Sequence, residues 1–547
     1  MDIDIIVVGS GPSGVNAAKR AIDEGLSVTL IDFGNDEPDL AESIPPQPFS
    51  TLRRSDPNQR RYFVGTTFGS EVDRNDRLGS HFTAPRAYIT KDVNALLPVA
   101  SETFFPVQSL ALGGLGVGWG AGCQTYEPFE LERAGLPADE MPSYYDEVIR
   151  DIGVSGATED DIAPAVLATR FAQPPTAIDT NARVILDTYH RRRSELQTMG
   201  LNLGRDPLAM LTEPLHRPGV EREANPYTDM DYYGCAGYSV YRPKYTVLEL
   251  QQHPKFRYLS GALVQRFDET DDAVTVSFVE HRSRRTQTVT GRKLLLAAGA
   301  LNSARIALRA KGMYGVRLPL LSNPMHYLPC VNLRMLGRPA DDRRHSLGQL
   351  IGVYTPPHRA PEHVIIGTIS YRSLLHFRIV RQMPLPPSLG LFLSRALMTS
   401  LTMVGVHHPE RQSPEKWIAL KATPNGDVLE AHYKSSAAEK SLISADLRGL
   451  VRCLWKLRCP PLANFSTAPG SSIHYAGTIP CRSESDSTLL RSDARGKLIG
   501  SRHVFLADSS GWSYLPAKGL TLTLMANARR VAHGAAVELR SLSGAER

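Results

Sequence analysis

Four residues near the start of the sequence, Gly9, Gly11, Gly14 and Asp32, have the types and the spacing that bind a dinucleotide. The first glycine permits a tight turn, the second lets the backbone approach a pyrophosphate, and the third lets a helix pack closely on a strand. The carboxylate of Asp32 would accept hydrogen bonds from the ribose hydroxyls of the adenosine half. The pattern indicates a dinucleotide-binding fold but does not separate FAD from NAD.

The elements around these residues have the order that the motif requires. Residues 3–8 are an apolar, β-branched run typical of a buried parallel strand, residues 15–24 read as a helix, and residues 27–31 read as a second strand that ends at Asp32. The N-terminus of such a helix offers amide donors and a positive dipole end to the phosphates.

Composition excludes several other classes of protein. The 547 residues are 42% hydrophobic and 22% charged, as in ordinary globular chains, and about 150 residues per domain suggests three or four domains. No apolar run is long enough to span a membrane. The net charge of +6 is mild, and the arginine clusters at 191–193 and 282–285 read as solvated faces, so we expect no nucleic-acid partner.

The cysteines and the N-terminus bear on metal content and location. The six cysteines form no CxxC pair, so we predict no metal and reduced thiols. The chain opens with Met-Asp-Ile-Asp and runs directly into a strand, which predicts the absence of a secretory signal and a cytoplasmic location.

A second glycine-rich segment, Leu112 to Gly122, favours FAD over NAD. Its alternating glycines indicate backbone that lies close to a flat ligand rather than a helix or strand. An NAD dehydrogenase of about 300–400 residues would leave this segment without a role.

Together with later motifs, this segment resembles the glucose–methanol–choline family of FAD-dependent oxidoreductases. The matching stretches are Gly113 to Gly120 (with Gly116 where the family has serine), Gly261 to Arg266, Lys293 to Ser303, His474 to Thr478, and Asp508 to Ala528. The resemblance implies that FAD is bound by Gly9, Gly11, Pro12, Ser13, Gly14, Asp32, Gly113, Gly114, Gly118, Trp119, Gly120, Val264, Ala298, Gly299, Asp508 and Ser509.

The resemblance also implies a catalytic base. In the family the histidine of the HxxGT motif stands in front of the flavin, which makes His474 the general base, a role that suits the ordinary histidine pKa. The family's second histidine or asparagine is replaced here by Gly519. Either His474 acts alone, or another residue reaches in, or the reaction has changed. Lys518 is the nearest candidate in sequence, and further candidates are His81, Tyr475, His326 and Trp512.

The predicted fold is α/β (α+β overall), a Rossmann-like FAD-binding domain assembled from separated segments plus a substrate-binding cap with an antiparallel sheet. We expect 1–130, 231–310 and 462–547 to form the FAD-binding domain, and 131–230 and 311–461 the cap. The runs 363–370 and 417–422 read as cap strands, the second ending in a turn at 424–427.

Two segments allow alternative interpretations. The pattern of residues 383–406 predicts a helix that leads into a strand. The alternative is an exposed hydrophobic segment that touches a membrane or guides a lipophilic substrate. The tyrosine- and glycine-rich stretch 231–241 is either the wall of a sugar pocket or a turn with core aromatics.

The leading functional hypothesis is FAD-dependent oxidation of an alcohol, on a sugar, polyol or glycosylated secondary metabolite. The electron acceptor stays open between oxygen, a quinone and a redox protein. The alternatives are a redox-neutral lyase or isomerase on the same fold, and an FAD-binding subunit without catalysis.

Overall fold

The computed structural model describes residues 3–36, 44–63, 84–234, 236–339, 341–370, 383–424, 426–481 and 490–545. His81 and Cys235 therefore lie outside the described residues. At the centre is a five-stranded sheet in the order β23-β11-β1-β2-β7, in which every pairing is parallel. Its strands are β1 (Ile5–Val8), β2 (Val28–Ile31), β7 (Phe256–Leu259), β11 (Lys293–Leu296) and β23 (Val504–Leu506).

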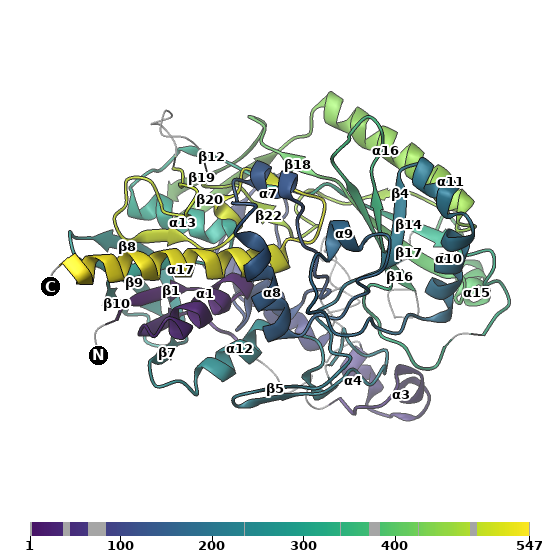
Figure 1. The fold of residues 1–547 in the computed structure, drawn as a ribbon, viewed down its shortest axis with the longest axis horizontal. Coiled ribbons are helices and arrows are strands. Elements are labelled where there is room, and N and C mark those ends of the chain that lie inside the picture. The colour runs from purple at the N-terminus through teal and green to yellow at the C-terminus, as the bar shows by residue number, and fades with distance from the viewer. Residues whose placement is uncertain are drawn as a thin grey trace.

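Alternate residues of β1 serve the two faces of this sheet, as strand geometry requires. Ile5 and Val7 belong to a core shared with three helices, α1 (Pro12–Asp23), α12 (Pro243–Leu250) and α17 (Thr521–Ala545). Ile6 and Val8 pack on the opposite side with α13 (Ala300–Ala310) and an antiparallel sheet of β8 (Ala262–Glu269), β9 (Val274–Glu280) and β10 (Thr286–Gly291). Figure 1 shows the long α17 lying along α1.

A six-stranded sheet lies at the end of the molecule away from both termini (Figure 1). Its order is β21 (Phe465–Ser466), β14 (Met325–Val331), β17 (Leu401–His407), β16 (Val364–Ser370), β15 (Leu350–Tyr354) and β4 (Leu201–Arg205). Helices α10 (Thr180–Arg191), α11 (Arg193–Thr198) and α16 (Ala437–Lys456) share a hydrophobic core with it. All its pairings are antiparallel, which confirms the predicted antiparallel sheet.

A four-stranded sheet joins the two predicted domains. It contains β12 (Arg317–Pro319), β19 (Lys416–Thr423), β20 (Gly426–Tyr433) and β3 (Val99–Ala100). Ile418, Leu420 and Leu429 pack in the same core as Ile6 and Val8 of the parallel sheet. Strands β12, β19 and β20, which were predicted as part of the cap, therefore pack against the dinucleotide-binding unit. Strand β21, which was predicted as part of the FAD-binding domain, pairs instead in the six-stranded sheet.

The smaller helices connect these layers. They are α3 (Phe49–Ser55), α4 (Gln59–Phe63), α6 (Val93–Leu96), α7 (Pro128–Ala134), α8 (Met141–Ile152), α9 (Ala163–Val166) and α15 (Pro387–Leu397). Helix α15 is followed by β17, as predicted for 383–406, and its Phe392 is 69% exposed. No helix in the described part of the chain is long and apolar enough to cross a membrane.

Candidate functional site

A cavity of about 300 Å³ joins the predicted cofactor motifs to the predicted base. Fourteen of the sixteen predicted cofactor residues line it, namely Gly9, Gly11, Pro12, Ser13, Asp32, Gly114, Gly118, Trp119, Gly120, Val264, Ala298, Gly299, Asp508 and Ser509. His474 and Tyr475 line the same cavity. The cavity lining does not include Gly14, Gly113, Lys518 and Gly519.

Two glycines of the first loop are required by close backbone approach. Gly9 has φ +98°, and a Cβ there would lie 2.6 Å from the carbonyl oxygen of Ala297. A Cβ on Gly14 would lie 1.8 Å from the carbonyl oxygen of Gly9, so a larger residue would push α1 away from the strand. The loop thus holds the N-terminus of α1 against the cavity, where its free amides suit a phosphate.

Asp32 is tied into this loop. Its carboxylate accepts hydrogen bonds from Ser10 and, at 3.4 Å, from the Tyr258 hydroxyl. Burial raises the pKa of Asp32 to about 6, although the hydrogen bonds from Ser10 oppose the rise. The hydroxyl of Ser10 also accepts from the amide of Gly113 at 2.8 Å, which joins the two glycine-rich segments.

The second glycine-rich segment contains a single 3₁₀ turn, Gly114–Val117, where the sequence predicted neither helix nor strand. This turn packs closely against the first loop. A Cβ on Gly114 would lie 3.3 Å from Gly11, and one on Gly116 would lie 2.9 Å from Pro12, so small residues are needed at both positions. The indole Nε1 of Trp119 donates to the carbonyl of Tyr241 at 2.8 Å. The stretch 231–241 therefore supports Trp119, and Tyr232 and Tyr233 within it are buried in a hydrophobic core.

A short strand pairing positions His474. Strand β22 (Tyr475–Ala476) pairs with β13 (Leu321–Ser322), which brings Asn323 beside His474. The amide nitrogen of Asn323 donates to the carbonyls of His408 (2.8 Å) and Pro516 (2.9 Å). Its oxygen therefore faces Nδ1 of His474, at 2.9 Å.

This arrangement sets the tautomer of His474. A carboxamide oxygen only accepts hydrogen bonds, so we assign the ring hydrogen of the neutral imidazole to Nδ1 and the lone pair to Nε2. The ring stacks on His407, with centroids 5.3 Å apart and planes 25° from parallel. The preceding residue, Ile473, has φ +62°, a strained conformation for a β-branched residue of the kind that occurs at functional sites.

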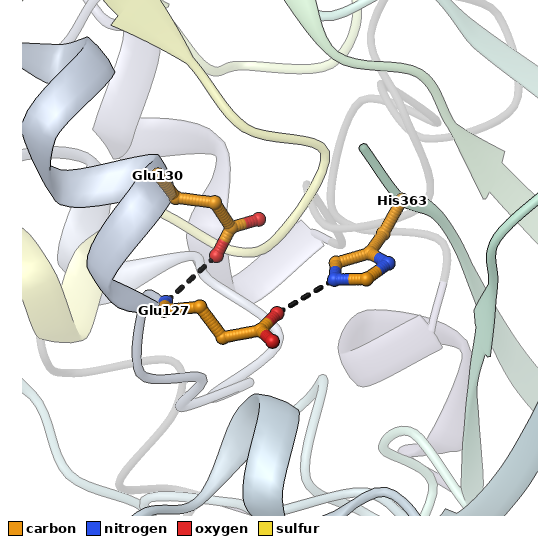
Figure 2. Close-up of side chains that lie close together, drawn as sticks. All are labelled: Glu127, Glu130 and His363. Atoms are coloured by element: carbon orange, nitrogen blue, oxygen red, sulfur yellow. Dashed lines mark hydrogen bonds and ion pairs between the residues drawn. The ribbon is translucent and has the colours of Figure 1, made fainter. Parts of the chain in front are cut away.

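Lys518 does not reach the cavity. Its ammonium is fully buried and donates to Glu127 (2.9 Å), Glu130 (2.6 Å) and the carbonyl of Ala165 (2.6 Å). Figure 2 shows Glu127 and Glu130 turned toward each other and toward His363. Three such side chains could hold a metal, but the Lys518 ammonium already supplies positive charge to both carboxylates, so we assign none.

Burial and the neighbouring charges shift the pKa values of the two carboxylates in opposite directions. Burial raises the pKa of Glu127, but hydrogen bonds from His363 and the charge of Lys518 outweigh it and lower that pKa to about 2. For Glu130 burial dominates and raises the pKa in spite of Lys518. The geometry gives Lys518 a positioning role for the segment 515–520, in place of the catalytic one considered from the sequence.

Gln124 occupies the space left by Gly519, a residue that the sequence did not single out. A Cβ at position 519 would lie 2.4 Å from Oε1 of Gln124, and the amide of Gly519 donates to that oxygen at 2.8 Å. The nitrogen of Gln124 donates to Oδ1 of Asp206 at 3.1 Å. A polar side chain from another segment thus packs against Gly519.

The other candidates have different surroundings. The hydroxyl of Tyr475 donates to Gly470 (2.6 Å) and accepts from the amide of Val107 (2.8 Å), so it braces the cavity wall. His326 packs edge-on against His408. Trp512 is buried against Tyr126. Neither His326 nor Trp512 lines the cavity.

No family model matches the chain. The curated protein paromamine 6′-oxidase of Streptomyces fradiae is 25% identical over 317 residues, which are 56% of this chain and 50% of that protein. The chain therefore matches about half the length of this relative. Since the identity is modest and partial, the alignment supports common ancestry rather than a common substrate.

Solved structures match over nearly the whole chain. Pyridoxine 4-oxidase from Mesorbium loti has a TM-score of 0.54 at 13% identity, over 97% of this chain and 99% of that one. An FAD-dependent oxidoreductase from Chaetomium thermophilum has a TM-score of 0.58 at 14% identity, over 98% and 100%. Formate oxidase from Aspergillus oryzae has a TM-score of 0.60 at 11% identity, over 99% and 100%. These matches show that the chain shares its overall fold with these proteins, one of which is an FAD-dependent oxidoreductase.

Proposed function

We propose that the protein binds FAD and oxidises an alcohol to a carbonyl compound, with His474 as the general base. One observation carries the proposal: His474, with its Nδ1–H held by Asn323, lines the same cavity as the dinucleotide-binding loop. The names of the similar proteins, two of them oxidases of pyridoxine and paromamine, support a small polar substrate.

The cavity suits FAD along its whole length. Asp32 would accept from the adenosine ribose, the α1 N-terminus would face the pyrophosphate, and Val264 lines the adenine end. At the other end, Thr521 and Leu524 of the first turn of α17 line the cavity, so the positive end of that helix faces the flavin region. Trp119 and Gly120 also line the cavity.

When bound, FAD supplies the hydride acceptor. The chain supplies the proton chemistry: Nε2 of His474 takes the proton of the substrate hydroxyl as the hydride leaves the carbon. The resulting imidazolium keeps its Nδ1–H on the oxygen of Asn323. Gln124 places a polar group beside Gly519, and neither residue lines the cavity.

Finer features remain our proposals. We propose a sugar, polyol or glycosylated metabolite as the alcohol, and a cytoplasmic location. The electron acceptor stays open between oxygen, a quinone and a redox protein.

The test is the visible spectrum of the purified protein with FAD, recorded without oxygen after adding sugars, polyols and aromatic alcohols in turn. We expect one class to bleach the flavin, and His474→Ala to slow bleaching at least ~100-fold with FAD still bound. The control His432→Ala removes a histidine stacked on Trp417, outside the cavity, and should bleach normally. A bound flavin that no alcohol bleaches would favour the lyase, isomerase or non-catalytic alternatives, and failure to bind FAD would reject the proposal.

A further inference from the structure

Arg305 is a buried cation at the wall of the cavity that joins the cofactor motifs to His474. It lies on α13, which begins directly after the predicted cofactor residues Ala298 and Gly299, and it is only 1% exposed. Among the described residues that line the cavity, Arg305 is the only lysine or arginine. Neither the dinucleotide motif nor the proposed proton transfer gives this charge a role.

Part of the guanidinium has no partner within the described chain. Its Nη2 donates to the carbonyl of Pro98 at 3.0 Å, whereas Nε and Nη1 are buried without a hydrogen-bond partner. Gln108 lines the same cavity and is held in a similar way, because its Nε2 donates to the carbonyl of Leu97 at 3.0 Å while its Oε1 has no partner. Buried polar atoms in folded proteins are almost always hydrogen-bonded. Two open donors and one open acceptor on two cavity-lining side chains therefore point to a ligand that offers both kinds of group.

Arg305 also lacks a carboxylate contact among the described residues. Arg529, another buried arginine, contacts Asp151 at 2.7 Å. The acid whose charge acts on Arg305 is Asp427, but the carboxylate of Asp427 is bonded to Arg309. Burial and the charge of Arg309 lower the pKa of Arg305 to about 10, which leaves the guanidinium charged at neutral pH. The fold thus holds a full positive charge at the cavity wall without an anion of its own.

The surroundings of this pair of side chains place it between the two ends of the cavity. The carbonyl that holds Gln108 belongs to Leu97, which packs in one small core with Phe33 at the adenosine end. On the other side of Gln108, the amide of Val107 donates to the hydroxyl of Tyr475, the residue after the proposed base. In FAD the pyrophosphate occupies the middle of the molecule, between the hydroxyls of the ribose and those of the ribityl chain. An anion flanked by hydroxyls is a ligand that would satisfy both the open donors and the open acceptor.

Charge balance explains why a cation is needed in this cavity. A pyrophosphate carries two negative charges, and the N-terminus of α1 supplies only about half a positive charge. The carboxyl groups of Asp32 and Asp508 also line the cavity and can only add negative charge. A guanidinium supplies a full positive charge, and its planar donors match the oxygens of a phosphate.

We infer that Arg305 pairs with the pyrophosphate of FAD, and that Gln108 accepts a hydrogen bond from a neighbouring hydroxyl of the cofactor. The inference rests on the FAD binding in the proposed function, and it adds the cation that the dinucleotide motif lacks. Arg305 is then a cofactor-binding residue that takes no part in proton or hydride transfer.

The experiment measures the displacement of FAD from the loaded protein by ADP and by adenosine. The two competitors share the adenosine group, but only ADP carries a diphosphate, so the ratio of their affinities reports the contribution of the phosphates. Released FAD is separated by ultrafiltration and measured by its fluorescence. The variants are Arg305→Met, Arg305→Lys and, as a matched control, Arg309→Met. Arg309 lies one turn further along α13, outside the cavity lining, and pairs with Asp427.

We expect ADP to displace FAD at lower concentrations than adenosine does, with similar affinity ratios in the wild type and in Arg309→Met. Arg305→Met should lower this ratio about 10–100-fold, because charge-assisted hydrogen bonds to phosphate are lost while the adenosine contacts stay. Arg305→Lys keeps the charge without the planar donors and should give an intermediate ratio. Where Arg305→Met retains too little FAD for displacement, the rise in melting temperature with ADP and with adenosine gives the same comparison.

Two outcomes would overturn the inference. An equal loss of ADP and adenosine affinity in Arg305→Met would show that Arg305 has a structural role. An unchanged ratio would show that the phosphates do not meet this cation, and bleaching by an anionic alcohol such as glycerate that then depended on Arg305 would assign the cation to the substrate.

The bleaching assay judges the proposed function separately. An ADP preference that depends on Arg305, in a protein whose flavin no alcohol bleaches, would support the inference and count against alcohol oxidation. A wild type that binds no FAD would reject both the inference and the proposed function.

Discussion

The substitution Gly519→Ala tests whether Gln124 truly occupies the place of the missing side chain. The new Cβ would lie 2.4 Å from Oε1 of Gln124, whereas ordinary contacts begin near 3.4 Å, so the carboxamide must retreat by 3.4 − 2.4 = 1.0 Å. That movement breaks the 2.8 Å hydrogen bond from the Gly519 amide. The backbone of Gly519 is outside the left-handed region, so the penalty arises from crowding alone.

The expected cost follows from these contacts. Overpacking costs about 1–3 kcal/mol and a lost hydrogen bond about 1 kcal/mol, so Gly519→Ala should lower the free energy of unfolding by roughly 2–4 kcal/mol. In a Gln124→Ala background the obstructing atoms are gone. There the same change should be neutral or stabilise by about 0.4–1 kcal/mol, through the lower entropy of the unfolded chain.

The assay is urea unfolding of the four proteins of this cycle at one fixed FAD concentration. Gly534→Ala is the control, because it lies in α17 and an added Cβ there meets nothing within 4 Å. It should stabilise by up to about 1 kcal/mol. An equal penalty for Gly519→Ala with and without Gln124 would refute the assignment of Gln124 to this space.

Three further predictions follow from the cavity wall and its supports. Asn323→Leu should slow flavin reduction about 10–100-fold, because it removes the hydrogen-bond acceptor that fixes the His474 tautomer. In anaerobic stopped-flow measurements the double variant should reduce the flavin at the same rate as His474→Ala alone. If the two effects on the rate multiply instead, Asn323 acts separately from His474. Lys518→Met should cost about 3–5 kcal/mol in urea unfolding, because the buried Glu130 and the partly exposed Glu127 both lose their cation. Arg502→Met at an exposed pair should cost less than about 1 kcal/mol, and similar costs would contradict the buried cluster. Only ionised Asp32 accepts hydrogen bonds from both ribose hydroxyls, and burial raises its pKa to about 6. The affinity for FAD should therefore fall up to tenfold per pH unit below about pH 6. In fluorescence titrations of the FAD-free protein, Asp32→Asn should remove this pH dependence.

Much of the cofactor half of the site could be predicted from the sequence. The constraint at Gly14 is local, because the atom that forbids a Cβ there is the carbonyl oxygen of Gly9, whereas at Gly9 the forbidding atoms belong to Ala297, which follows the neighbouring strand β11. The candidate base His474 also belongs to a short motif, His474 to Thr478, whose residues lie within a few positions of one another. A short pattern of residue types therefore carries the information.

The groups that surround the substrate end depended on tertiary structure. Asn323 lies 151 residues from His474, Gln124 lies 395 residues from Gly519, and Lys518 meets Glu127 across 391 residues. Nothing in the local sequence marks these partners, because asparagine, glutamine and glutamate occur throughout the chain. The position of Lys518 in the sequence made it a candidate catalytic residue. In the structure its ammonium instead contacts the carboxylates of Glu130 on α7 and of Glu127, the residue before that helix.

The dinucleotide-binding fold and its glycine-rich loop can be predicted from the sequence alone, because they depend on backbone sterics and on periodic apolar residues. The polar group beside Gly519 and the carboxylates that hold Lys518 depend on the tertiary structure. The physical reason is that a buried polar group takes its partner from whatever the packing of distant elements places within 3 Å, and that packing is a property of the whole chain.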